Sequence, residues 1–384
     1  MIYYTVRQLP RYKQLSFEDF LYGNAEDFKI EKEYYGTWTP NTKTYCIESV
    51  PDKIKNGFHV REVGEKLVRF NEKYKHLTDA DKGTLYSSFH IPKKTGGLRK
   101  IDAPNQELKK ALTELKGILE NDFKALYHTS AFAYIKGRST VDAVKKHQKN
   151  SSKWFGKFDL SNFFGSTTIE FVISMLENIF PFSSFLKIQK GREELTKALS
   201  LGFLDGVLPQ GTPLSPILTN IMMIPIDYNI SKKLRNREDS TFVYTRYADD
   251  FIISSRYDFK FKEIEEIINE TLKEFDAPFR INGKKTRYGS SSGRNWNLGV
   301  MLNKDNEITV GHQKKKKFKA MLTSYILDRK NGKAWDHNDI QVLDGYRSYY
   351  SMIEGKEKID EILNHIGEKF GANIQQALKE DLSL

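Results

Sequence analysis

Two adjacent carboxylates, Asp249 and Asp250, interrupt an apolar, β-branched stretch that runs from residue 242 to residue 255. The stretch reads Phe-Val-Tyr-Thr-Arg-Tyr-Ala-Asp-Asp-Phe-Ile-Ile-Ser-Ser, a pattern that predicts a strand, a tight turn and a second strand. Like charges side by side repel, and partial burial raises the cost of ionising both. A cation between them relieves this cost, and hard carboxylate oxygens favour Mg²⁺ or Mn²⁺. The alternative is a solvated Asp-Asp turn, which four residues alone do not exclude.

Three further segments bear on that choice. Residues 153–165 read Lys-Trp-Phe-Gly-Lys-Phe-Asp-Leu-Ser-Asn-Phe-Phe-Gly, a strand-like run that ends in Asp159 and then turns. Residues 208–216 form a loop ordered by prolines and a glycine, and residues 91–104 place a basic Gly-Gly turn between two extended runs. With Tyr-Ala-Asp-Asp last, the set resembles the reverse transcriptase family over about residues 85–320.

The resemblance implies an α+β fold of the right-hand polymerase type, in which an antiparallel palm sheet packs on helices beside fingers and a helical thumb. Strands and helices alternate without a strict βαβ repeat, which also favours an α+β design. The expected divisions run in chain order: an N-terminal extension at 1–80, fingers at 81–155, a palm at 156–300 with a fingers insertion near 180–215, and a helical thumb at 301–384.

Local patterns predict individual elements. A hairpin is expected at 85–104 and a helix at 105–126, with Asn105 as its N-cap. Apolar spacing predicts a strand at 154–159 and helices at 169–179 and 261–275. The Ser- and Gly-rich residues 289–293 predict a loop or boundary.

The resemblance assigns the metal site to three carboxylates. Nucleotidyl transfer needs cations that lower the pKa of the primer hydroxyl and stabilise charge on the phosphorus. Asp159 and Asp249 are expected to be the principal ligands of two Mg²⁺ (or Mn²⁺) ions, with Asp250 closer to the primer end. Lys285 is the candidate proton donor to pyrophosphate, with its neighbour Lys284 as the alternative.

Substrate contacts are expected on three segments. In the family, the position of Phe164 holds the ring that clashes with a 2′-hydroxyl and so selects deoxynucleotides; the alternative is that this ring or Phe163 is core. The resemblance places Gln210 and Gly211 against the incoming nucleotide, and glycine permits a close backbone approach.

Cationic groups are the remaining substrate and nucleic-acid candidates. Arg99 and Lys100, after the Gly-Gly turn, suit a triphosphate, with Arg99 as the expected contact; the alternative is a solvated basic turn. Tyr247 is expected to contact nucleic acid. The lysine run Lys314, Lys315, Lys316 and Lys317, with the tyrosines of 346–350, suits backbone neutralisation in the thumb. A solvated charged face is the alternative for the lysines, and burial in the core is the alternative for the tyrosines.

Composition agrees with a soluble protein, and its positive charge suits either a polyanionic partner or a merely basic soluble protein. The net charge is +11 over 384 residues, with a pI near 9.2. A single cysteine, Cys46, excludes an internal disulfide framework and fits a reducing, cytoplasmic compartment. No apolar run approaches membrane-spanning length, so no membrane association is expected. The expected partners are an RNA template, a DNA or RNA primer and deoxynucleoside triphosphates; the sequence leaves the oligomeric state open.

Differences from the motifs of known groups of reverse transcriptase indicate the type of enzyme. Retron enzymes usually show Asn-Ala-x-x-His and Val-Thr-Gly segments, where this chain has residues 139–147 and Asn297-Leu-Gly-Val. Residues 137–143 look more like group II intron enzymes. The compact length favours a stand-alone bacterial enzyme of the defence-associated or abortive-infection groups.

The leading hypothesis is therefore RNA-directed DNA synthesis on a dedicated noncoding RNA, in anti-phage defence. One alternative is untemplated or protein-primed synthesis at the same site. The other is a catalytically silent RNA-binding module, against which the retention of three carboxylates argues.

Overall fold

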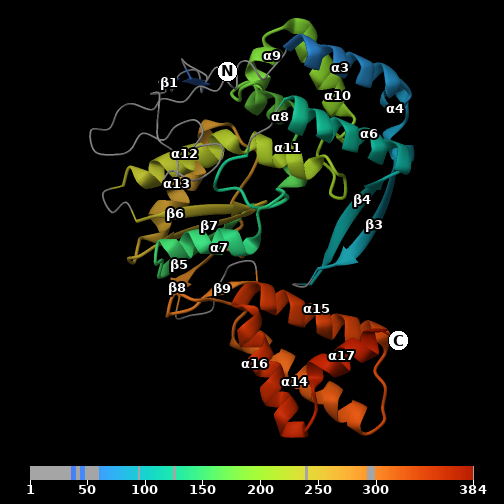
Figure 1. The fold of residues 1–384 in the computed structure, drawn as a ribbon. Helices are drawn as coiled ribbons and strands as arrows, with labels where there is room; N and C mark the ends of the chain where they lie inside the picture. The colour runs from blue at the N-terminus through green and yellow to red at the C-terminus, as the bar shows by residue number, and fades with distance from the viewer. Residues whose placement is uncertain are drawn as a thin grey trace. The chain divides into compact units, whose positions relative to one another are not determined.

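The computed structural model describes residues 36–39, 44–47, 60–93, 96–123, 127–237, 241–291 and 299–383 (Figure 1). The chain forms two compact units, each assembled from several segments. The first unit comprises Met1–Ser139, Lys157–Ile253 and Lys260–Thr286, and the second comprises Thr140–Gly156, Ser254–Phe259 and Arg287–Leu384. At the N-terminal end of the described residues, β1 (Gly36–Thr39) pairs antiparallel with β2 (Thr44–Ile47).

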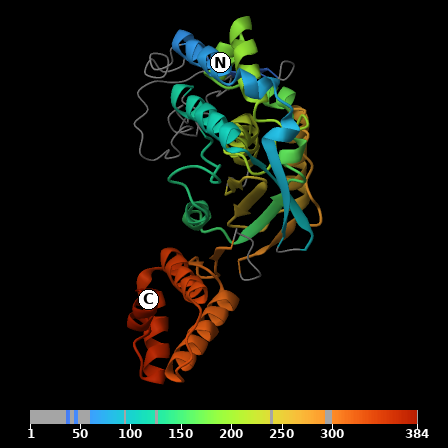
Figure 2. The same cartoon turned by 90° about the vertical axis from the view of Figure 1, so that its right-hand side faces the viewer.

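The predicted hairpin of the first unit is confirmed. Strand β3 (Tyr86–Pro92) pairs antiparallel with β4 (Leu98–Pro104), and the register runs from Tyr86 opposite Pro104 to Pro92 opposite Leu98. Gly96 and Gly97 make the turn at positive φ, where a side chain would be strained. Most side chains of both strands are exposed, and the hairpin extends as a long ribbon in Figure 2.

Helices make up most of the rest of the first unit. They are α3 (Val60–Lys73), α4 (Lys75–Asp79), α5 (Lys82–Leu85), α6 (Gln106–Gly117), α8 (Ile169–Leu176), α9 (Phe182–Leu186), α10 (Gln189–Ser200), α11 (Ser215–Met222), α12 (Ile224–Arg235) and α13 (Phe261–Glu274). Asn105 caps α6 as predicted, because its side chain accepts a hydrogen bond from the Leu108 N–H. A π-helical turn, η1 (Ile118–Asp122), continues α6, and a short 3₁₀ turn, η2 (Phe164–Ser166), precedes α8.

A four-stranded sheet carries two of the sequence motifs, the run that ends in Asp159 and the Asp-Asp turn. Its strands are β5 (Trp154–Asp159), β6 (Val243–Tyr247), β7 (Asp250–Ser255) and β8 (Arg287–Ser290), in the order β6-β7-β5-β8. Helix α12 packs against β6 and against α13, as Figure 1 shows. The predicted strands at 154–159 and around the Asp-Asp turn are confirmed. A loop or boundary was predicted at 289–293. The loop alternative is wrong for Gly289 and Ser290, because pairing at the sheet edge overrides their weak strand propensity. Residues 292 and 293 lie outside the described residues.

The second unit is mainly helical, which confirms the helical C-terminal region. It contains α7 (Thr140–Lys149), α14 (His312–Lys330), α15 (His337–Glu354), α16 (Lys356–Phe370), α17 (Ile374–Ser383) and a short pair of strands, β9 (Met301–Leu302) and β10 (Ile308–Thr309). Helices α14 to α17 pack together around buried Phe318, Leu343 and Leu363 (Figure 2). In the part of the chain that the structure describes, no helix is long and apolar enough to cross a membrane.

Candidate active site

The Asp-Asp pair lies at a hairpin tip. Strand β6 ends at Tyr247 and β7 begins at Asp250, so Ala248 and Asp249 make the turn between them. Ala248 has φ of 55°, a left-handed conformation that is uncommon for a residue with a Cβ. The strand-turn-strand prediction is therefore confirmed, and the turn is a tight one.

Backbone hydrogen bonds bring the end of β5 against this turn. The Leu160 N–H donates to the Asp249 carbonyl oxygen at 3.0 Å. On its other side, the Asn282 N–H donates to the Asp159 carbonyl oxygen at 2.7 Å. Asp159 is thus fixed beside Asp249, although 90 positions separate them in the numbering of the sequence.

The neighbouring carboxylates perturb one another. Burial, and then the charge of Asp250, raises the pKa of Asp249 to about 6, with a smaller contribution from Asp159. Burial also raises the pKa of Asp250, while the nearby Lys157 opposes that change. These directions are those expected of like charges held together in a partly buried site.

Two lysines supply positive charge to the cluster. The Lys285 ammonium donates to both carboxylate oxygens of Asp159, at 2.9 and 3.0 Å. The Lys157 ammonium donates to Oδ2 of Asp250 at 2.8 Å. The sequence motifs did not single out Lys157, but strand alternation places it on the same face as Asp159, two residues away in β5.

The donor chemistry fits hard divalent cations. Within the described residues, no group of three or more His, Cys, Asp or Glu side chains is arranged so that it could hold a metal ion. However, Oδ1 of Asp250 is buried and has no hydrogen-bond partner in the described structure. Because a buried carboxylate oxygen without a partner is costly, Asp250 retains an acceptor for a cation. Asp159 and Asp249 are the neighbouring oxygen donors that would complete such a site.

The loop at 208–216 lies against the hairpin. The Asp102 N–H of β4 donates to the carbonyl oxygen of Gln210 at 2.7 Å. Gly211 has φ of 122°, and a Cβ there would lie 2.9 Å from Ile101 Cγ2 and 3.0 Å from the Asp102 carbonyl oxygen. Glycine is therefore required for the close approach of this loop to β4. Lys100 lies on the same strand and forms an ion pair with Asp102 at 2.9 Å.

The two phenylalanines after Asp159 occupy different surroundings. Phe163 is 2% exposed and packs against Phe279, with ring centroids 4.9 Å apart. Phe164 is only partly buried and meets Phe163 edge-on. Phe163 is therefore the core residue of the pair, and Phe164 is the one that retains an accessible ring surface.

A tyrosine that the sequence motifs did not indicate also lies at this site. Tyr134 has a left-handed φ of 59°, is 50% exposed, and its ring centroid is 6.4 Å from that of Tyr247. Burial raises the pKa of the Tyr134 hydroxyl, as does the charge of Asp249, whereas Arg99 opposes the change. Tyr134 therefore lies within electrostatic reach of both the carboxylate turn and the Arg99 side chain of β4.

The predicted lysine run begins two residues after the start of α14 in the second unit. Lys314 donates to the Gly299 carbonyl oxygen, and Lys315 forms an ion pair at 3.0 Å with Glu354, whose side chain is 4% exposed. Lys314, Lys316 and Lys317 are exposed, and Lys315 is partly buried. Lys314 and Lys315 thus brace the unit, but only Lys315 is partly withdrawn from solvent.

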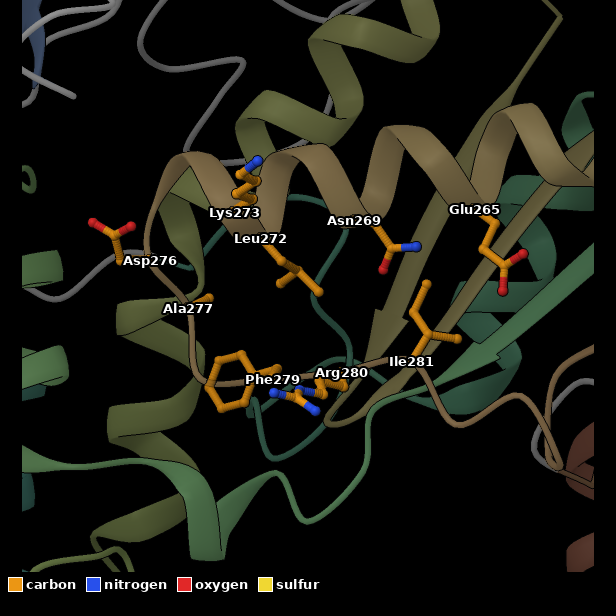
Figure 3. Close-up of a pocket in the computed structure, with 9 residues that line it drawn as sticks. All are labelled: Glu265, Asn269, Leu272, Lys273, Asp276, Ala277, Phe279, Arg280 and Ile281. Carbon is orange, nitrogen blue, oxygen red and sulfur yellow. The ribbon is translucent and has the colours of Figure 1, made fainter.

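A hollow of about 620 Å³ lies on the first unit between α13 and residues 276–281 (Figure 3). Its lining side chains are Glu265, Asn269, Leu272, Lys273, Asp276, Ala277, Phe279, Arg280 and Ile281. The Arg280 carbonyl oxygen accepts a hydrogen bond from the Ser161 N–H. This wall therefore backs the segment that follows Asp159, and the hollow itself contains none of the catalytic candidates.

Comparisons with known proteins agree with these observations. A family model described as "Reverse transcriptase (RNA-dependent DNA polymerase)" matches residues 91–320. The retron Ec73 reverse transcriptase of Escherichia coli is 31% identical over 69% of this chain and 82% of its own length. The retron Ec83 reverse transcriptase of the same species is 28% identical over 77% of this chain and 90% of its own. Both are retron enzymes, although this chain departs from the two retron segments noted in its sequence.

A solved structure of Candida albicans telomerase, in complex with a fragment of telomeric RNA, is 11% identical. The match covers 78% of this chain and 66% of that one, with a TM-score of 0.45.

Proposed function

The chain belongs to the reverse transcriptase family of RNA-directed DNA polymerases, and from this premise we propose that it copies a dedicated noncoding RNA into DNA at Asp159, Asp249 and Asp250. The observation that carries the site assignment is the junction of β5 with the β6–β7 turn. It collects three carboxylates, and burial together with mutual repulsion raises the pKa of Asp249 to about 6.

Asp159 and Asp249 would hold two divalent ions, with Asp250 offering its unpartnered Oδ1. When bound, such ions lower the pKa of the primer hydroxyl and stabilise charge on the transferred phosphoryl group. Lys285 forms an ion pair with Asp159, and its side chain is 55% exposed, so it can reach toward a substrate phosphate. In this role Lys285 holds the proton that pyrophosphate takes as it leaves.

The sugar and triphosphate would be selected on the first unit. Phe164, which is partly buried and lies five residues after Asp159, would clash with a 2′-hydroxyl. Arg99 and Lys100, on the exposed hairpin, supply cations for the triphosphate. Gln210 and Gly211 form the loop that braces this hairpin through Asp102.

The identity of the template is the finer part of the proposal. The names of the matched relatives are those of retron enzymes, and the chain carries a net charge of +11. A structured noncoding RNA is the polyanion that suits both facts, and anti-phage defence is the proposed biological setting. Lys316 and Lys317 of α14, which are exposed, would neutralise its phosphates.

The test is to purify the protein, sequence the nucleic acid that copurifies, and supply dNTPs and Mg²⁺ with that RNA. We expect DNA complementary to one defined RNA, and no product from an Asp159→Asn variant. Product that stays attached to protein through phenol extraction would favour protein priming. RNA binding without synthesis by the wild-type protein would favour the silent module.

A further inference from the structure

A buried ion pair lies behind the catalytic turn. Asp227 of α12 and Arg246 of β6 are both 0% exposed, and the guanidinium binds the carboxylate through Nε and Nη2 at 2.8 Å each. The Tyr244 hydroxyl also donates to Asp227, at 2.7 Å. Arg246 directly precedes the Tyr-Ala-Asp-Asp turn, so this pair lies three positions from Asp249.

Stability alone is a poor explanation for this pair. Removing two charges from water is costly, and well-packed apolar residues in place of a buried ion pair are often as stable or more stable. A fully buried pair is better explained when its unused donors perform a further task. Arg246 has such a donor, because Nη1 does not contact Asp227.

That donor reaches the turn itself. Arg246 Nη1 donates to the Ala248 carbonyl oxygen and to Oδ1 of Asn220, each at 3.2 Å. Ala248 is the residue held at φ of 55°, a conformation that costs on the order of 1 kcal/mol or more for a non-glycine residue. The guanidinium therefore supports the strained peptide that immediately precedes Asp249.

The same hydrogen-bond network also holds residues 130–134, the segment that leads to Tyr134. Asn220 Nδ2 donates to the Ala133 carbonyl oxygen at 2.7 Å. The Arg246 backbone N–H donates to the Ser130 carbonyl oxygen at 2.6 Å, and its carbonyl accepts from the Phe132 N–H at 2.9 Å. The ring of Tyr134, which follows Ala133, is thereby placed beside Tyr247.

We propose that Arg246, Asp227 and Asn220 are positioning residues that fix the Tyr247–Asp250 turn, so that Asp249 faces Asp159 before any cation or substrate arrives. Asp227 orients the guanidinium, and Asn220 ties it to the segment of Tyr134. The inference rests on the proposed polymerase function and adds what holds its carboxylates. Preorganised groups of this kind act mainly on the transition state, because a misplacement of about 1 Å costs on the order of a hundredfold in rate.

Two variants separate positioning from simple stability. Arg246→Lys keeps a positive charge beside Asp227 but loses the planar fork that reaches Ala248 and Asn220 together. The triple variant Asp227→Leu, Tyr244→Phe, Arg246→Met replaces the pair by apolar groups, and its melting temperature should stay near that of wild type. The matched control is Lys233→Gln, which breaks an ion pair of α12 with Glu274 of α13 away from the turn.

Two measurements are made on each folded variant. The first is primer extension, in which we expect kcat to fall about ten- to a hundredfold for Arg246→Lys and the triple variant, with KM for dNTP changed less than threefold. The second is Mn²⁺ binding to the free protein, followed by electron paramagnetic resonance, in which we expect affinity to fall at least fivefold. The Lys233→Gln control should match wild type in both.

A triple variant with native melting temperature, native kcat and native Mn²⁺ affinity would overturn the proposal. Failure of the wild-type protein to make DNA would instead overturn the proposed function. In that case the Mn²⁺ affinities still decide whether the network positions the carboxylates. Should the triple variant not fold, Arg246→Lys carries the same two measurements.

Discussion

Replacing Asp249 by Asn should stabilise the fold while it abolishes DNA synthesis. The pKa of Asp249 is raised from 3.8 to about 6, chiefly by burial and then by the charge of Asp250. An acid whose pKa is higher in the folded state holds its proton more tightly there, so stability falls as pH rises from about 4 to 6. At 1.36 kcal/mol per unit, the ionised group therefore costs about 3 kcal/mol at pH 7.5 and about 1.5 kcal/mol at pH 5. The asparagine variant lacks this cost.

The measurement is urea unfolding in EDTA at both pH values, paired with primer extension in Mg²⁺. We expect the gain in free energy of unfolding to be roughly twice as large at pH 7.5 as at pH 5. Adding Mg²⁺ should raise the melting temperature of wild type more than that of the variant, because a cation binds the native carboxylates. Asp79→Asn, at an exposed position closing α4, serves as the control and should leave all three readouts unchanged. A gain in free energy of unfolding that does not depend on pH, or DNA synthesis by Asp249→Asn near the wild-type rate, would refute the reasoning.

Three further outcomes are expected. Phe164→Val should raise ribonucleotide use relative to deoxynucleotide use about tenfold or more in single-nucleotide incorporation, and an unchanged ratio would place the gate elsewhere. Burial lowers the pKa of His147 to about 3. Below pH 6.5 the imidazole is therefore protonated in the unfolded chain but stays neutral in the folded protein. This group alone should therefore lower the free energy of unfolding by about 2 kcal/mol between pH 7.5 and pH 5, opposite in sign to the contribution of Asp249. Measured by urea unfolding, the stability of His147→Gln relative to wild type should therefore be about 2 kcal/mol higher at pH 5 than at pH 7.5. The double variant Lys316→Gln, Lys317→Gln should reduce the log–log salt slope of RNA binding by about 1 to 2, whereas superimposable slopes would mean that neither lysine contacts phosphate.

The features that the sequence predicted well are those encoded within a few residues. The strand at 154–159 follows from a short, largely apolar run that ends in Asp159, and the cap at Asn105 follows from a single side chain reaching the Leu108 N–H. The hairpin that carries Asp249 and Asp250 was recognisable for the same reason, because its turn interrupts two β-branched runs.

The features that the sequence did not predict depend on tertiary pairing. Nothing within the local pattern joins Arg246 to Asp227, which lies 19 residues away on another element. Glu354 likewise accepts hydrogen bonds from the Val310 N–H and the Lys315 ammonium. It is the last residue of α15, whereas Lys315 lies in α14. Such partners are set only when packing places the elements, which is why the contacts of Lys314 and Lys315 within the unit could not be predicted from the sequence.

The two lysines of the carboxylate cluster differ in how readily they can leave it. Lys285 is 55% exposed, and an ion pair so accessible to water contributes about 0 to 1 kcal/mol. Lys157 is 21% exposed and lies within β5. Exchange of an ammonium for another cation is therefore easier at Asp159 than at Asp250. A cation bound at Asp159 would release Lys285, and the lysine side chain, still tethered next to Asp159, would then be available to a substrate phosphate. The proposed roles of Asp159 as ligand and Lys285 as proton donor thus belong to one charge exchange, in which neither group is left unpaired.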